Sequence, residues 1–201
     1  MLDVLIIGGG VSGISCALVL GSAHKKIFVQ DKKISIITHQ KASSLQDAIF
    51  YNAYGISSGK LGSEILTEST AQLHTTYPNI SQIENEKVIS ISGQAGNFLV
   101  TTNKNSYNTR IIVVAIGSSN LFGIDGLQQY LEPHKKSLPE KNRIQLVNTD
   151  HLVAEGIYVA GTLAGHRSQL VIASGSGAAV ATDILTLWNN GIETHVHDSI
   201  R

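Results

Sequence analysis

The chain has 201 residues, enough for one large domain or two small ones, and its 15 basic residues balance 15 acidic ones. This balance indicates neither nucleic acid nor an anionic membrane surface as a partner. The single cysteine excludes an internal disulfide and a Cys-x-x-Cys pair, and the lack of a signal peptide or a membrane-spanning apolar run predicts a cytoplasmic protein.

The chain opens with an apolar strand at residues 3–7, a glycine-rich turn and a helix. The turn has the pattern G-x-G-x-x-G, with its glycines at Gly8, Gly10 and Gly13. In such a turn the first glycine allows the bend, the second lets a pyrophosphate approach the backbone, and the third lets the helix pack close to the strand. The free N–H groups of the first helical turn, which includes Val11 and Ser12, would then face the phosphates. Cys16 falls inside this helix, where inert packing is expected.

Residues 26–30 predict a second strand that ends at Asp31, 23 positions after Gly8. This spacing is about the one at which a βαβ unit brings a carboxylate to a ribose 2′-OH. A βαβ unit that binds nothing is the alternative, but the coincidence of strand, glycines and acid favours a dinucleotide site.

The middle of the chain is polar and irregular over residues 32–52, apart from a short candidate strand at residues 35–38. A glycine turn then leads into a helix predicted at residues 61–77, which Pro78 ends. Alternating residues at 87–92 and 98–102, separated by a turn, predict a β-hairpin.

The last third repeats the junction of an apolar strand with a glycine turn. Residues 111–115 lead to Gly117 and residues 156–160 lead to Gly161, with a short strand predicted between them at residues 144–147. A final helix at residues 169–189 contains Gly175 and Gly177, which we expect to permit close packing. In an open α/β sheet, ligands bind outside the carboxyl ends of the strands, so the three glycine turns are expected at one edge.

These motifs, in this order, resemble the FAD-binding domain of thioredoxin-reductase-like flavoproteins. The resemblance covers nearly the whole chain and rests on residues 3–13, residues 54–77, Ala115-Ile116-Gly117, Ile124-Asp125-Gly126-Leu127, residues 156–162, Ser168-Gln169-Leu170 and residues 173–177.

The resemblance implies a Rossmann-like α/β fold for FAD or NAD(P), in which a parallel sheet with helices carries a small antiparallel β-meander. It further implies one FAD-binding domain over residues 1–201, with FAD as the cofactor and no metal site. The implied cofactor-binding residues are Gly8, Gly10, Val11, Ser12, Gly13, Asp31, Val88, Ala115, Ile116, Gly117, Gly161, Thr162, Gln169 and Leu170. No catalytic residue is assigned.

Three departures from the family pattern bear on function. Relatives insert an NADPH-binding domain with a Cys-x-x-Cys pair between the third and fourth motifs, whereas only residues 128–152 lie there in this chain. Thr162 replaces the aspartate of the Gly-Asp motif, and its hydroxyl can still donate and accept a hydrogen bond. Ile116 replaces the threonine of the Ala-Thr-Gly motif.

Three functions follow as hypotheses. The first is an FAD-dependent oxidoreductase or electron-transfer flavoprotein without a redox disulfide, reduced by NAD(P)H or by a separate reductase partner. The second is a non-catalytic FAD-binding module, or the flavin subunit of a split reductase. The third is a plain NAD(P)-binding protein, for which Asp31 would favour NAD. A homodimer is compatible with the low surface charge.

Four further side chains are weighed as neighbours of the flavin. His39 and His166 could act as acid or base, although an ordinary loop role is favoured for each. Tyr51 and Tyr54 could stack near the site, with core packing as the alternative.

Overall fold

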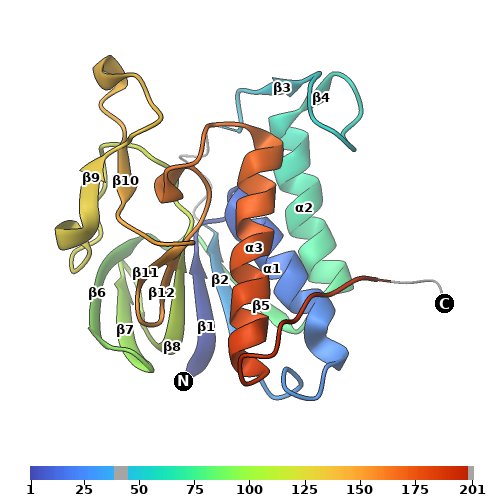
Figure 1. Cartoon of the computed structure of the whole chain (residues 1–201). Helices are drawn as coiled ribbons and strands as arrows, with labels where there is room; N and C mark the ends of the chain where they lie inside the picture. Colours follow the sequence, from blue (N-terminus) through green and yellow to red (C-terminus); the bar gives the residue numbers. More distant parts are fainter. Residues whose placement is uncertain (39–44, 199–201) are drawn as a thin grey trace.

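The computed structural model describes residues 1–38 and 45–198, and its main feature is a mixed β-sheet with helices on one face (Figure 1). Within these residues the sheet has eight strands, in the order β11-β12-β8-β1-β2-β5, and the β6–β7 hairpin joins it at β8. The strands of this sheet are β1 (Leu2–Ile7), β2 (Ile34–Thr38), β5 (Ile80–Glu84), β6 (Val88–Gln94), β7 (Asn97–Thr102), β8 (Ser106–Val114), β11 (Leu152–Ala154) and β12 (Ile157–Val159). The predicted Rossmann-like sheet and its antiparallel β-meander are thereby confirmed.

The helices that cover the sheet are α1 (Val11–Ser22), α2 (Gly62–Thr76) and α3 (Leu170–Trp188). Short 3₁₀ helices occupy Ala23–Lys25, Gln128–Tyr130, Pro139–Lys141 and Gly161–Ala164. Two small antiparallel pairs lie outside the main sheet: β3 (Ile49–Phe50) with β4 (Lys60–Leu61), and β9 (Leu131–Pro133) with β10 (Ile144–Leu146).

The central strands have apolar side chains on both faces, over residues 4–7 in β1 and residues 111–114 in β8, as expected for strands buried on both faces. One set of their side chains, which includes Ile6, Ile36 and Val113, packs with α1, α2 and α3. The other set, which includes Leu5, Ile37 and Val114, packs beneath the β6–β7 hairpin and the β9–β10 pair. The sheet therefore lies between two hydrophobic cores, and packing on both faces fixes the positions of its strands.

The predicted second strand at residues 26–30 is wrong. Backbone hydrogen bonds from Val29 and Gln30 to the carbonyl of Lys26 make this segment a series of turns. The parallel neighbour of β1 is instead β2, in the register Val4↔Ile34 and Ile7↔Ile37. A short run with a buried Val29 resembles a strand in sequence, but its period cannot distinguish a strand from a packed turn.

Helix α3 is more apolar than the sequence analysis anticipated. Its 19 residues have the length and composition of a membrane span, so the expectation that no such run exists is wrong. The face that carries Val180, Ala181, Ile184 and Leu185 is fully buried in the core beside α1, which is the packing of a core helix.

Candidate functional site

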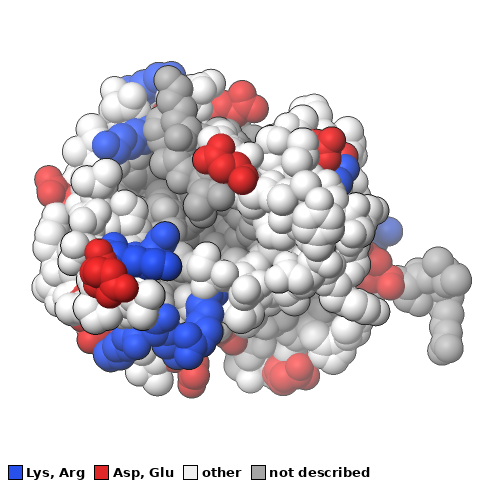
Figure 2. Space-filling model, turned by 90° about the horizontal axis from the view of Figure 1, so that it is seen from above, with Lys and Arg blue, Asp and Glu red and all other residues white. Residues whose placement is uncertain are grey.

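The three glycine turns meet at the carboxyl edge of the sheet. Strands β1, β8 and β12 are parallel neighbours, and Ile7 pairs with Val114, which pairs with Val159. The turns that follow these strands therefore lie side by side, as predicted. Figure 2 looks down on this edge and shows a hollow in the surface there.

The first glycine turn packs closely on itself and on Ala115, the residue after β8. A β-carbon on Gly13 would lie 1.9 Å from the carbonyl oxygen of Gly8, and one on Gly8 would lie 2.4 Å from that of Ala115. Gly8 also has a φ of +118°, which side-chain-bearing residues rarely adopt. These two glycines are therefore required by the protein's own packing.

Gly10 differs from both neighbours. Its φ of −81° suits any residue, and a β-carbon there would meet no atom of the described residues within 4 Å. The protein alone therefore does not require glycine at this position. Open space over bare backbone at a helix start is what a closely approaching phosphate needs.

The second and third turns are also open backbone. Gly117 and Gly161 have φ values of +79° and +74°. A β-carbon on Gly117 would have the Thr162 hydroxyl, at 3.9 Å, as its one neighbour within 4 Å among the described residues. A β-carbon on Gly161 would lie 2.6 Å from the Ser12 hydroxyl, so this turn rests against the start of α1.

Two helices begin at this edge without caps. No side chain in the described part of the chain caps the N-terminus of α1 at Gly10 or that of α3 at Gln169, and neither first turn contains an acidic residue. The free N–H groups and the helix dipole leave positive potential at both ends. The start of α1 and the open glycine turns form a cradle that fits the pyrophosphate of a dinucleotide.

Helix α3 extends beyond the start of α1, as Figure 1 shows. The two helices touch where a β-carbon on Gly177 would lie 2.0 Å from the Ser12 carbonyl oxygen. Seven residues of α3 precede Gly177, and at 1.5 Å per residue they span about 10 Å. Gln169 and Leu170 are therefore placed well beyond the pyrophosphate cradle.

Asp31 does not lie at this edge, which corrects its predicted role at the ribose. It precedes β2, beside Lys33, whose backbone N–H donates to the Asp3 carboxylate at the start of β1. The length of the strands separates it from Gly8, because β1 and β2 are parallel. Because Asp31 lies far from the glycine turn, it gives no reason to expect NAD instead of NADP.

The remaining predicted residues have mixed surroundings. Val88 begins β6 with its side chain buried in the core, so that side chain is not available to a ligand. Ala115 is buried, whereas Ile116 is 38% exposed at the carboxyl edge. Tyr51 and Tyr54 are exposed, so core packing is wrong for both. His39 lies outside the described residues.

A side-chain cluster of His151, His166 and Ser176 lies at the same edge, and of these three residues the sequence pointed only to His166. The Nε2 atom of His151 lies 3.0 Å from Nε2 of His166 and 3.0 Å from Oγ of Ser176. Ser176 in turn accepts the backbone N–H of Gly161 at 2.8 Å. Among the described residues, no group of three or more His, Cys, Asp or Glu side chains could hold a metal ion.

Basic side chains gather on one rim of the hollow (Figure 2). The segment from β9 to β10 carries four exposed cations, and Arg143 from this segment donates to the Ser118 hydroxyl just after Gly117. The exposed cations of this segment are Lys135, Lys136, Lys141 and Arg143. Lys135 forms an ion pair with Glu132 at 2.8 Å, and the other three cations add to the positive potential of the helix ends.

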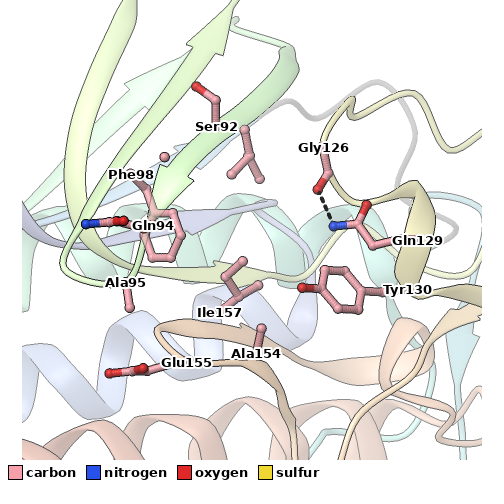
Figure 3. Close-up of a pocket in the computed structure, with 12 residues that line it drawn as sticks. Ser92, Gln94, Ala95, Phe98, Gly126, Gln129, Tyr130, Ala154, Glu155 and Ile157 are labelled. Carbon is pink, nitrogen blue, oxygen red and sulfur yellow. Dashed lines mark hydrogen bonds between the residues drawn. The ribbon is translucent and has the colours of Figure 1, made fainter.

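A separate cavity of about 530 Å³ lies under the β6–β7 turn, between residues 126–130 and the β11–β12 turn (Figure 3). In this view the Tyr130 hydroxyl points toward Ile157, and the Gln129 amide donates a hydrogen bond to the Gly126 carbonyl. Because Ile157 begins β12, this cavity lies at the other end of that strand from Gly161. It is therefore distinct from the glycine turns.

The chain is similar in sequence to known oxidoreductases. Residues 2–162 match the family model described as pyridine nucleotide-disulphide oxidoreductase. The ferredoxin–NADP reductase of Pediococcus pentosaceus is 29% identical over 165 residues, which cover 78% of this chain and 47% of that protein. The chain thus spans about half the length of this curated relative.

Solved structures share the fold at low sequence identity. A thioredoxin reductase from Gloeobacter violaceus matches with a TM-score of 0.72 and 14% identity, over 99% of this chain and 98% of the other. An oxidoreductase from Agrobacterium tumefaciens matches with a TM-score of 0.70 and 17% identity, over 92% and 98% of the two chains.

Proposed function

Because the chain belongs to the pyridine nucleotide-disulphide oxidoreductase family, we propose that it binds FAD at the carboxyl edge of its sheet and serves as a flavin-dependent oxidoreductase. The observation that carries this proposal is the cradle formed by the uncapped start of α1 and the open backbone at Gly10 and Gly117. Such a cradle supplies hydrogen-bond donors and positive potential to a pyrophosphate without a charged side chain.

The residues of the cradle have separate roles in this proposal. The backbone N–H groups of Val11, Ser12 and Gly13 bind the pyrophosphate, and the Thr162 hydroxyl, beside Gly117, hydrogen-bonds the polar chain between phosphate and flavin. The start of α3 at Gln169 faces the pyrimidine edge of the flavin, where the helix dipole favours negative charge. The flavin itself supplies the redox chemistry.

This chain cannot carry the dithiol step that the family name implies. Cys16 is its one cysteine, is fully buried in α1, and burial raises the pKa of its thiol. Thiol–disulfide exchange requires an accessible thiolate. Electrons therefore leave the flavin for an acceptor that is not a cysteine pair of this chain.

A second candidate is a flavin subunit that requires a partner for reduction. It is favoured by the span of about half the curated relative, and by the short segment between Gln128–Tyr130 and Leu152–Ala154, which is too short for another nucleotide-binding domain. In this form a partner supplies the hydride donor, and the exposed cations beside Arg143 lie on the approach to the site.

The absorbance spectrum of the purified protein from 300 to 600 nm, recorded before and after anaerobic NADPH addition, tests both candidates. Flavin bands that bleach support a self-sufficient oxidoreductase. Bands that bleach with dithionite but not with NADPH or NADH support the partner-dependent form. If no flavin bands appear even after reconstitution with FAD, both candidates are wrong.

A further inference from the structure

A two-residue turn between β10 and β11 has an unusual backbone. Asp150 and His151 both have positive φ, at 46° and 69°, between Thr149 and Leu152, which exchange backbone hydrogen bonds of 3.0 and 2.9 Å. Tight hairpin turns of this form strongly favour Asn-Gly, because glycine tolerates positive φ. A histidine at the second position is therefore strained, and such strain persists where the surroundings use the side chain.

The His151 imidazole makes two short contacts on one nitrogen. Its Nε2 lies 3.0 Å from both Ser176 Oγ and His166 Nε2. Two Nε2–H groups cannot face each other at this separation, so the axis between the rings holds one proton. One imidazole must donate and the other must accept.

The surrounding groups keep both rings neutral. Burial lowers the pKa of His151 against the opposing effect of Asp150, and burial, then His151, Lys136 and His134 lower that of His166. His134 is oriented separately, because its Nδ1 accepts the Lys136 backbone N–H and its Nε2 donates to the His166 carbonyl. A neutral pair at pH 7 can make the donor–acceptor contact that a pair of cations cannot.

Ser176 connects this pair to the nucleotide edge. Its side chain is buried on α3, and its Oγ accepts the Gly161 backbone N–H at 2.8 Å. The Gly161 turn, with positive φ, rests against Ser12 at the start of α1. A fixed orientation of the Ser176 hydroxyl therefore holds the third glycine turn against the pyrophosphate cradle.

We propose that His151 is a positioning residue for the nucleotide site: paired with His166, it orients the Ser176 hydroxyl, which holds the Gly161 turn in its binding conformation. This inference rests on the proposed function, since it assigns a role toward the bound dinucleotide. It explains why a strained turn contains histidine instead of glycine.

The substitution His151→Gly tests the proposal, because it removes the imidazole and relieves the backbone strain together. We expect the apoprotein to unfold at the same temperature as wild type or higher, while the dissociation constant for FAD, measured by fluorescence titration, rises at least tenfold. Asp150→Gly is the matched control. It relieves a similar strain, and within residues 1–38 and 45–198 its side chain makes no hydrogen bond that would be lost. FAD affinity should therefore stay at the wild-type value.

Ser176→Ala provides a second variant that leaves the turn intact. It should weaken FAD binding to a similar extent. The double variant should bind FAD as tightly as whichever single variant has the lower affinity, because both substitutions act through one hydroxyl. Wild-type affinity in either single variant overturns the proposal.

Nitrogen-15 NMR of the histidine rings in the apoprotein separates this inference from the proposed function. At pH 7 we expect one proton on the two facing Nε2 atoms, so that one ring has a bare Nε2. Protons on both would contradict the pairing whether or not FAD binds. If the pair is observed and wild-type protein binds no FAD, the proposed function fails instead.

Discussion

Gly177 of α3 lies directly against the backbone carbonyl of Ser12 in α1, with no side chain between them. A β-carbon on Gly177 would come within 2.0 Å of that oxygen and 2.8 Å of its carbon. A hydrogen bond from the Ser15 hydroxyl to the Ser174 carbonyl, at 2.8 Å, ties the same helices together nearby. The close contact places the start of α1 beside Gly177, so that the first turns of α3 extend past it.

Gly177→Ala should therefore destabilise the apoprotein. The added methyl would force the helix backbones apart, because backbone atoms cannot rotate away as a flexible side chain can. We expect a loss of about 1–3 kcal/mol in the free energy of unfolding, measured by urea denaturation.

Gly175→Ala is the control for this change. Gly175 lies two residues away on the opposite side of α3, where a β-carbon would meet none of the described residues within 4 Å. Alanine is favoured over glycine inside a helix, so stability should rise by about 0.5–1 kcal/mol. An equal loss at both positions would show that the contact with Ser12 is not the cause.

Gly10→Ala should separate ligand binding from folding. The backbone at Gly10 suits alanine, and no atom of residues 1–38 or 45–198 lies within 4 Å of a β-carbon built there. The apoprotein should keep its unfolding temperature, while the methyl group blocks the approach of a phosphate and weakens FAD binding at least tenfold in a fluorescence titration. Unchanged affinity would show that the pyrophosphate does not pass over Gly10.

The comparison of Gly10 with Asp31 shows which part of the site could be predicted from sequence. The glycine turn follows an apolar strand directly, so its place at the carboxyl edge is set by local chain geometry. The position of Asp31 depended on counting a strand at residues 26–30, where Ile27 is 87% exposed and Val29 is buried within turns. Hydrophobic spacing over five residues does not determine whether a segment is extended.

The His151–Ser176 contact shows what the sequence could not provide. The two residues lie 25 positions apart and meet because β12 and the Gly161–Ala164 helix return the chain to the carboxyl edge. Asp150 tolerates positive φ, but without a glycine after it the sequence does not identify this pair as a tight turn. By contrast, Gly175 and Gly177 were expected to act alike, and only Gly177 makes a close contact.

Glu86→Gln should weaken the β-meander. The buried Glu86 carboxylate accepts hydrogen bonds from Thr102, Asn105 and Tyr107, at 2.6, 2.7 and 2.9 Å. Burial alone would raise the pKa of Glu86, but these three donors lower it overall. Glutamine offers one acceptor oxygen and places an NH₂ group against donors, so we expect a loss of about 2 kcal/mol in urea denaturation at pH 7.

The same carboxylate gives a pH test. Because its pKa is lower in the folded protein, its stabilisation is present above pH 4.5 and is lost as the pH falls through the folded value. The difference in stability between wild type and Glu86→Gln should therefore narrow in acid. A constant difference would mean that the charge of Glu86 contributes nothing.

Cys16 should be inert in the folded protein. The side chain is fully buried and burial raises the pKa of its thiol, so an aromatic disulfide reagent should react only after denaturation. Cys16→Ala should leave the reduction of bound flavin by NADPH at its wild-type rate, whatever that rate is. A large loss in this variant, with stability and FAD content unchanged, would give the thiol a role in electron transfer.

The neutral histidine pair should make stability depend on pH between about 7 and 5.5. The pKa values of His151 and His166 are lowered from 6.5, so the unfolded chain binds more protons in this range than the folded protein does. The free energy of unfolding must therefore fall as the pH decreases from 7 toward the folded pKa values, and these residues add no slope above pH 7. Urea denaturation of the apoprotein at intervals of half a pH unit measures this fall, because carboxyl groups titrate mainly below about pH 5.

In His151→Gly, which lacks one of the two rings, the slope of stability against pH should be smaller. The same slope in both proteins would show that the rings titrate normally in the folded state.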